Sequence, residues 1–410
     1  MHKADEMKSL KVEKSGKVKS KPERRYDIDW LRVLAMLSVF LFHCARFFDY
    51  EDWHVKNIQL DLGLSVFVSF VILWIMPLFF LLSGEGSYFS LSFRTSGKYI
   101  TERFKRLVVP FLFGTFIVLI PLQVYIERVS HLQFVGSFIE FYPHYFDGFY
   151  ALGGNFAWMG LHLWFLEFLF IFSLISLPLF LYLRKEAIKR RISKVAAYLK
   201  KPGTIFLLGI PLVIMGLLVD LQPGGIGLLI FNRAFGGWSL AEYTIFFIYG
   251  YLIASDLNFK EAIERHRGIS LLLGVITSII GITAWYYSDV LGHNFPSYHI
   301  IDAIFRPFSS WFLLVAILGF GSKYLSFNNR VLKYANEAVL PFYVLHQTVI
   351  VTIGFYIASW DASVIVKYFI LSTLSFAVIV SIYDLLIKRN NWLRFLFGMR
   401  LKKRLPEHVR

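Results

Sequence analysis

The sequence predicts an all-α polytopic membrane protein with about ten transmembrane helices and with both termini in the cytoplasm. Hydrophobic residues make up 56% of the 410 residues and charged residues only 17%, with a mean hydropathy of +0.56. Apolar runs that approach the thickness of a bilayer recur along the chain. Lys and Arg collect in alternate segments between these runs, as they do in cytoplasmic loops.

The chain divides into a polar start, a membrane domain and a basic end. Residues 1–25 are rich in Lys and nearly free of aromatic side chains, which predicts a disordered basic cytoplasmic tail. The membrane domain covers 26–390, and residues 391–410 predict a basic amphipathic cytoplasmic tail. The ten candidate spans are 30–48, 64–83, 107–126, 161–183, 204–219, 240–254, 269–287, 307–321, 338–358 and 365–387.

The net charge of +15 follows from this topology. With the N-terminus in the cytoplasm, 36 of the 43 Lys and Arg residues fall in cytoplasmic segments and five in segments on the other side. An odd number of spans would mix these two classes. We therefore expect a multi-pass protein of the cell inner (cytoplasmic) membrane, in contact with membrane lipids and with no nucleic-acid partner.

The first span carries a line of polar residues. Arg32 and His43 are eleven residues apart, so they share one helix face about 16 Å apart. Asp29 and Arg46 extend the same stripe. Ionisable side chains inside a membrane are costly and usually mark function. The structural alternatives are an arginine that reaches the membrane interface and a histidine that is satisfied inside the bundle.

Five short motifs follow one another along the chain. They are Asp29-Trp30-Leu31-Arg32 with His43, then Met76–Gly84, Glu102–Pro110, His162–Leu166 and Phe342–His346. In this order they resemble the acyltransferase 3 family of integral membrane acyltransferases, and the similarity covers roughly residues 25–390. The resemblance depends on all five motifs in this order, because an Arg and a His eleven residues apart form a loose pattern by themselves.

The resemblance implies transfer of an acyl group, acetyl or succinyl, from cytoplasmic acyl-coenzyme A to a hydroxyl of an extracytoplasmic glycan or surface polysaccharide. Such a hydroxyl needs a base near neutral pH, and an imidazole suits that task. We therefore expect His43 to be the general base, with a covalent acyl-histidine as an open alternative. Arg32 is expected to position the donor or to stabilise negative charge.

Arg103, Lys105 and Arg106 stand at the cytoplasmic start of the third span. They could bind the phosphates of coenzyme A through charge-assisted hydrogen bonds. The alternative is topological charge or binding of anionic lipids, because cations belong at that depth. The alternative is favoured for Lys105.

Glu167 is a carboxylate inside the fourth span and a further catalytic candidate. Intramembrane carboxylates face a cavity or a partner, so Glu167 is expected to pair with Arg32, Arg46 or His43. A purely structural ion pair explains it equally well.

His162, Trp164, His346 and Arg46 are expected to line the acceptor cavity. Trp164 is expected to pack or to gate near the outer mouth of that cavity. For His346 the alternative is a hydrogen bond between helices.

The sequence contains no His/Cys pair at zinc-ligand spacing, no Walker loop and no dinucleotide glycine pattern. We therefore expect no bound cofactor or metal, with acyl-coenzyme A acting as a substrate. The rival function is a proton-coupled transporter or a flippase of a glycolipid, in which His43, Glu167 and His346 would relay protons. No internal repeat is evident, which weakens that rival.

Overall fold

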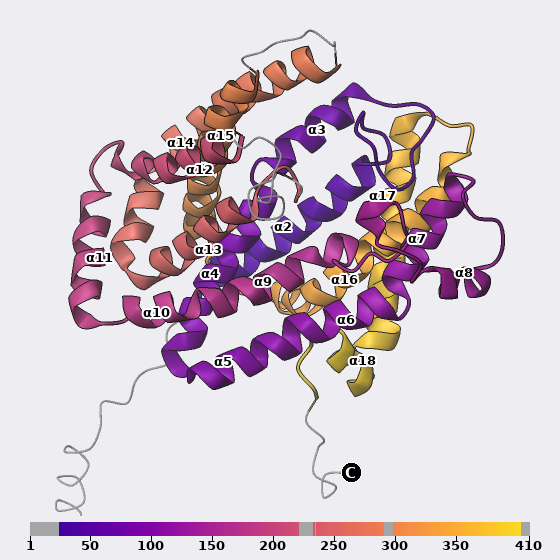
Figure 1. Ribbon diagram of the computed structural model, residues 1–410. Coiled ribbons are helices and arrows are strands. Elements are labelled where there is room, and N and C mark those ends of the chain that lie inside the picture. Colours follow the sequence, from indigo (N-terminus) through magenta and orange to yellow (C-terminus); the bar gives the residue numbers. More distant parts are fainter. Residues whose placement is uncertain (1–23, 221–232, 234, 291–297, 403–410) are drawn as a thin grey trace, which may run out of the picture.

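The computed structural model describes residues 24–220, 233, 235–290 and 298–402 (Figure 1). Helices make up the fold, and the described residues contain no β-strand. The predicted all-α class is therefore confirmed. The predicted N-terminal tail lies outside the described residues except for its last two positions, and so do residues 403–410 of the predicted C-terminal tail.

The helices before residue 200 come in three groups along the chain. The first group is α2 (Tyr26–Ala45), α3 (Leu62–Ile72) and α4 (Ile75–Phe93). The second is α5 (Ser96–Arg103), η1 (Phe104–Val108), α6 (Val109–Phe116), α7 (Leu119–Ser130) and α8 (Phe138–His144). The third is η2 (Tyr150–Leu152), η3 (Leu161–Leu163), α9 (Trp164–Ile175), α10 (Leu177–Leu183) and α11 (Glu186–Tyr198).

The remaining helices include the three longest of the chain. They are η4 (Thr204–Gly209), α12 (Ile210–Asp220), α13 (Leu240–Ser255), α14 (Leu257–Trp285), η5 (Tyr286–Val290), α15 (Tyr298–Tyr324), α16 (Arg330–Ala358), α17 (Val364–Ile382), η6 (Tyr383–Ile387) and α18 (Asn391–Leu396).

Seven helical stretches among the described residues are long and apolar enough to cross a membrane. An eighth is the pair Leu161–Ile175 and Leu177–Leu183, which is bent by 48°. Two shorter apolar helices are Thr204–Val219 and Leu240–Ser255. These stretches follow the order of the ten predicted runs, and they make the chain a multi-pass membrane protein. The count of ten spans and the orientation of the termini stay predictions.

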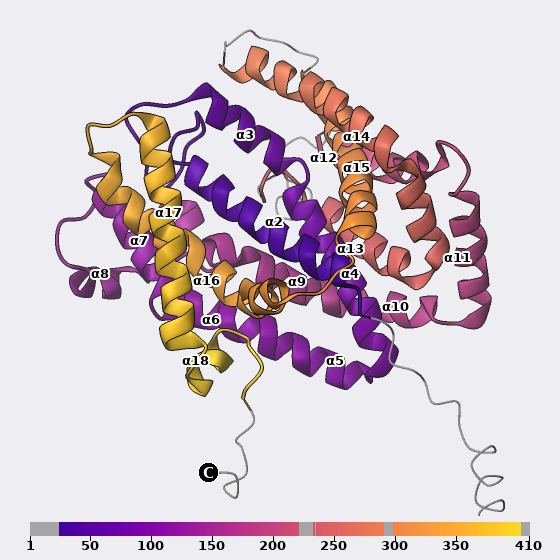
Figure 2. The same ribbon diagram turned by 180° about the vertical axis from the view of Figure 1, so that it is seen from behind.

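Helix α2 crosses the middle of the molecule in both ribbon views (Figures 1 and 2). It packs against α3, α4, α15, α16 and α17. Two glycines allow an especially close contact between α4 and α13. A Cβ atom added to Gly84 would lie 1.9 Å from the carbonyl oxygen of Phe247, and one added to Gly250 would lie 1.8 Å from that of Leu81. Small residues let membrane helices approach in this way.

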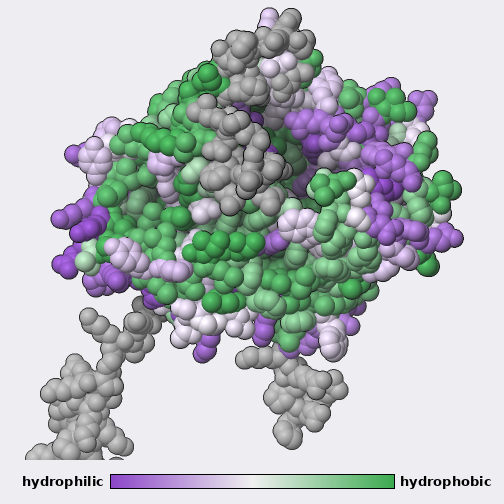
Figure 3. All heavy atoms as spheres, in the orientation of Figure 1, coloured by the Kyte–Doolittle hydropathy of each residue, from purple (hydrophilic) through white to green (hydrophobic). Residues whose placement is uncertain are grey.

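The surface separates apolar from polar regions. Figure 3 shows hydrophobic residues across the middle of one face, and hydrophilic residues gather around the loops on the right-hand side of that view. We call this side, which carries loop 46–61 and α8, the α8 end, and we call the side that carries α5 and the start of α2 the α5 end. On α14, Leu272 and Ile279 are 56% and 60% exposed, as expected for side chains that face lipid.

Candidate active site

Three histidines from separate helices meet in the half of the bundle toward the α8 end. His43 lies near the end of α2, His162 lies in η3 at the start of α9, and His346 lies in α16. The ring centroid of His346 is 4.9 Å from that of His43 and 5.1 Å from that of His162. The packing of α2 and of η3 against α16 therefore brings together three of the predicted site residues.

Hydrogen bonds to carbonyl groups fix which nitrogens of two rings carry a proton, because a carbonyl oxygen only accepts. His43 Nδ1 lies 3.0 Å from the carbonyl oxygen of Val39, and His346 Nδ1 lies 2.5 Å from that of Tyr343. Both Nδ1 atoms are therefore donors. His346 Nε2 then accepts from His43 Nδ1 at 3.1 Å, which leaves a lone pair on His43 Nε2.

The third ring is oriented differently. His162 Nε2 donates to the carbonyl oxygen of Val344 at 3.2 Å, so Nδ1 carries the lone pair. This Nδ1 atom is buried and has no hydrogen-bond partner among the described residues. The hydroxyl of Tyr343 donates to the backbone carbonyl of His162 and ties η3 to α16. A buried acceptor without a partner is a place where water or a substrate hydroxyl can bind.

Loop 46–61 covers the His43 ring from the α8 end. The ring of Trp53 stacks on His43 with centroids 6.1 Å apart and an interplanar angle of 26°. Three ion pairs hold the loop: Asp49 lies 2.5 Å from Arg46 and 2.6 Å from Lys56, and Arg46 lies 2.7 Å from Glu51. The guanidinium of Arg46 therefore binds acids of the loop, and its place in the acceptor cavity stays a prediction.

A second polar group adjoins the three histidines, and no sequence pattern predicted it. His54 Nδ1 is bonded to the carboxylate of Glu127, and the hydroxyl of Tyr150 donates to the same carboxylate at 2.8 Å. The side-chain amide of Gln347 lies 3.1 Å from His54 Nε2. Burial raises the pKa of Tyr150, and the Glu127 carboxylate raises it further, so this phenol remains a donor.

Basic residues from α2, α5 and η1 gather at the α5 end of the molecule. Arg32 pairs with Asp29 at 3.2 Å. Arg103 donates to the hydroxyl of Ser87 at 2.8 Å and to the carbonyl oxygen of Ser83 at 3.3 Å. Arg32, Arg103 and Arg106 lie within electrostatic range of one another. This arrangement of cations suits an anionic group such as a phosphate.

Lys105 differs from Arg103, which donates to the hydroxyl of Ser87. Lys105 and Arg106 are both exposed, and neither side chain forms a hydrogen bond or an ion pair with another of the described residues. Lys105 and Arg106 both belong to the π-helical turn η1, whose extra residue per turn changes the direction of neighbouring side chains. This position fits the interpretation of Lys105 as a residue at the membrane surface.

The structure does not bring Glu167 to Arg32, Arg46 or His43. One of its carboxylate oxygens is buried and has no hydrogen-bond partner among the described residues. The expected ion pair is therefore absent from this part of the chain. Trp164 packs in an aromatic cluster, 5.2 Å from the ring of Phe235.

No group of three or more His, Cys, Asp or Glu side chains that could hold a metal ion occurs within residues 24–220, 233, 235–290 and 298–402.

Comparisons with known proteins agree with the sequence motifs. Residues 25–384 match a family model described as an acyltransferase domain. The chain is 24% identical to the glucans biosynthesis protein C of Salmonella heidelberg over 380 residues. This alignment covers 92% of this chain and 94% of that protein. The protein of the same name from Escherichia coli is 25% identical over 339 residues, with coverages of 82% and 84%. No solved structure matches the chain significantly.

Proposed function

The chain belongs to the acyltransferase 3 family of membrane acyltransferases, and on that premise we propose the route of the acyl group. The protein takes an acetyl or succinyl group from acyl-coenzyme A on the cytoplasmic side and transfers it to a hydroxyl of an extracytoplasmic glycan. The observation that carries this proposal is the contact of His43 Nδ1 with the carbonyl oxygen of Val39 and with His346 Nε2, which leaves the lone pair of the neutral ring on Nε2.

His43 is the general base of the proposed transfer. Its Nε2 removes the proton of the acceptor hydroxyl as the oxygen attacks the thioester carbonyl. The carbon–sulfur bond then breaks, and the thiolate of coenzyme A takes the proton back from His43. His346 acts as a positioning residue, because its Nε2 accepts from His43 Nδ1 and so keeps the reactive nitrogen free.

Arg32, Arg103 and Arg106 bind the donor in this proposal. The excess of Lys and Arg in alternate segments favours a cytoplasmic position for the α5 end. Along α2, Arg32 lies eleven residues before His43, a distance of about 16 Å in a helix. The phosphates of coenzyme A bind at the arginines, and its extended thiol arm carries the acyl group toward the histidines.

The names of the relatives support a glucan as the acceptor. Both are called glucans biosynthesis proteins, and each alignment covers more than four fifths of both chains. A hydroxyl of a glucose unit would enter from the α8 end, where Trp53 of loop 46–61 stacks on His43.

The test uses sealed membrane vesicles of known orientation that contain the purified protein. Radiolabelled acetyl- or succinyl-coenzyme A is added on the side of the α5 end, and a glucan is enclosed on the other side. We expect label in the enclosed glucan from one of the two donors. Label that enters only when donor and glucan share one side would contradict transfer across the membrane.

A further inference from the structure

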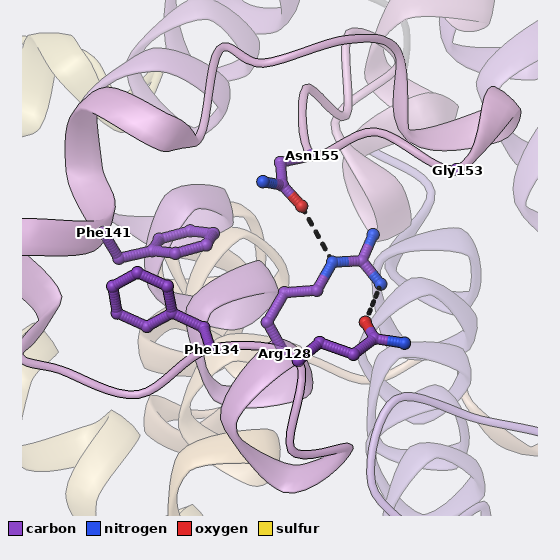
Figure 4. A pocket seen from close by; sticks show the side chains of 6 residues that line it. Arg128, Phe134, Phe141, Gly153 and Asn155 are labelled. Atoms are coloured by element: carbon purple, nitrogen blue, oxygen red, sulfur yellow. Dashed lines mark hydrogen bonds between the residues drawn. The ribbon is translucent and has the colours of Figure 1, made fainter.

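A second site lies in the lobe that follows the third span at the α8 end. A cavity of about 400 Å³ opens there, within the size range of ligand pockets, about 300–1,000 Å³. Its lining residues come from the end of α7, from the loop between α7 and α8, from α8 and from the loop after η2 (Figure 4). They are Arg128, Gln133, Phe134, Phe141, Gly153 and Asn155.

One side of the cavity presents fixed polar groups. Arg128 Nε donates to Asn155 Oδ1 at 2.8 Å, Nη1 donates to Gln133 Oε1 at 2.9 Å, and Nη2 donates to the carbonyl oxygen of Gly154 at 2.7 Å. Figure 4 shows the guanidinium between the two side-chain amides. The amide NH₂ of Gln133 has no recorded acceptor within the described part of the chain. It is a donor available to a ligand.

The other side of the cavity is aromatic. Phe134 and Phe141 pack edge to face with ring centroids 5.1 Å apart. Four apolar residues that are 82–93% exposed each lie within two positions of a lining residue, and they are Leu132, Val135, Ile139 and Leu152. Apolar groups so exposed around a polar pocket are typical of a binding surface. The ligand should therefore combine polar edges with apolar faces.

A hexose ring has this composition. Its ring hydroxyls can donate and accept at the same time, so they match both a guanidinium, which only donates, and side-chain amides, which donate and accept. Its carbon–hydrogen faces pack against aromatic and aliphatic side chains. A lipid tail would leave the amide NH₂ of Gln133 without a partner, and a free phosphate would not use the aromatic wall.

The cavity is connected to the histidine site. Arg128 directly follows Glu127, whose carboxylate is bonded to His54 and to Tyr150. His54 in turn contacts Gln347, the residue after His346. A glycan seated in the cavity therefore lies beside the network that reaches the proposed acceptor side of His43.

We propose that this cavity is a subsite that binds one hexose unit of the acceptor glycan, separate from the unit that is acylated. The inference rests on the proposed function for the identity of the ligand. A subsite in residues 128–155 would make the enzyme prefer a polymer over a free monosaccharide, because a single sugar cannot occupy the cavity and the histidine site together.

The test measures binding directly, independently of acyl transfer. Purified full-length protein in lipid nanodiscs is titrated with a linear glucose heptasaccharide by isothermal titration calorimetry. Gln133→Ala removes the free amide donor, and Gln133→Trp fills the mouth of the cavity. Gln59→Ala is the matched control, because Gln59 is also exposed in a loop at the α8 end but does not line the cavity. Thermal unfolding checks that each variant is folded.

We expect saturable binding to the wild-type protein and to Gln59→Ala with equal Kd. Gln133→Ala should raise Kd about threefold to tenfold, the effect of one lost hydrogen bond, and Gln133→Trp should raise it at least tenfold. An absence of binding to the wild-type protein, or a wild-type Kd for Gln133→Trp, overturns the subsite. Binding as expected without any acyl transfer would contradict the proposed function and leave the subsite standing.

Discussion

Replacement of His346 tests the hydrogen bond that keeps His43 Nε2 free. His346→Ala removes one of the two acceptors of His43 Nδ1, and the carbonyl oxygen of Val39 at 3.0 Å remains. Because Nδ1 keeps one acceptor, the loss is that of a single hydrogen bond, about 0.5–1.5 kcal/mol, which corresponds to roughly a twofold to 13-fold loss of rate. We therefore expect kcat to fall about threefold to tenfold. KM for the donor should stay unchanged, because the arginines lie about 16 Å away along α2.

A conservative variant separates positioning from packing. His346→Gln still offers an amide oxygen to His43 Nδ1, so it should retain more kcat than His346→Ala. His131→Ala is the control, since His131 is exposed at the end of α7. The assay is steady-state acyl transfer by folded protein over a range of donor concentrations. A loss below about twofold in His346→Ala, or a Gln variant no better than the Ala variant, would refute the positioning role.

Two further predictions compare neighbouring residues. Arg103→Ala should raise KM for acyl-coenzyme A about tenfold or more, whereas Lys105→Ala should change it less than twofold. Donor-saturation assays measure both values, and equal effects of the two variants would argue against a specific donor site. Gly84→Ala should lower the midpoint of thermal unfolding by several degrees, because the added Cβ would overlap the backbone of α13. In the control Gly86→Ala the added Cβ meets open space, so the midpoint should stay unchanged. Similar midpoints for the two variants would contradict the close contact of α4 and α13.

Local sequence patterns predicted the all-α class and the order of the apolar helices. The apolar runs fix which stretches become membrane helices, because each must satisfy its backbone hydrogen bonds internally. The fourth run shows what hydropathy misses. Residues 161–183 form one apolar run, but the structure bends it by 48° between α9 and α10. Pro178 stands at the start of α10, where it has no backbone N–H to continue the helix.

The site was predictable only in part. Polar residues inside apolar runs pointed to His43, His162 and His346 individually, and the packing of three helices decides that their rings meet. The pair of His54 and Glu127 escaped prediction because each lies beyond the end of a predicted span, with no spacing to connect them. The expected partners of Glu167 were wrong for a related reason. Nearby loop acids, Asp49 and Glu51, neutralise Arg46 first.

The most direct test of the central claim is acyl transfer by His43→Ala. Wild type, His43→Ala and His144→Ala, an exposed histidine on α8, are compared in purified form with radiolabelled acyl-coenzyme A and a glucan. The loss of a general base lowers rates by about 10²–10⁴-fold, so the account predicts that loss in His43→Ala and near wild-type rates in His144→Ala. A folded His43→Ala protein that transfers label within threefold of the wild-type rate would contradict the account.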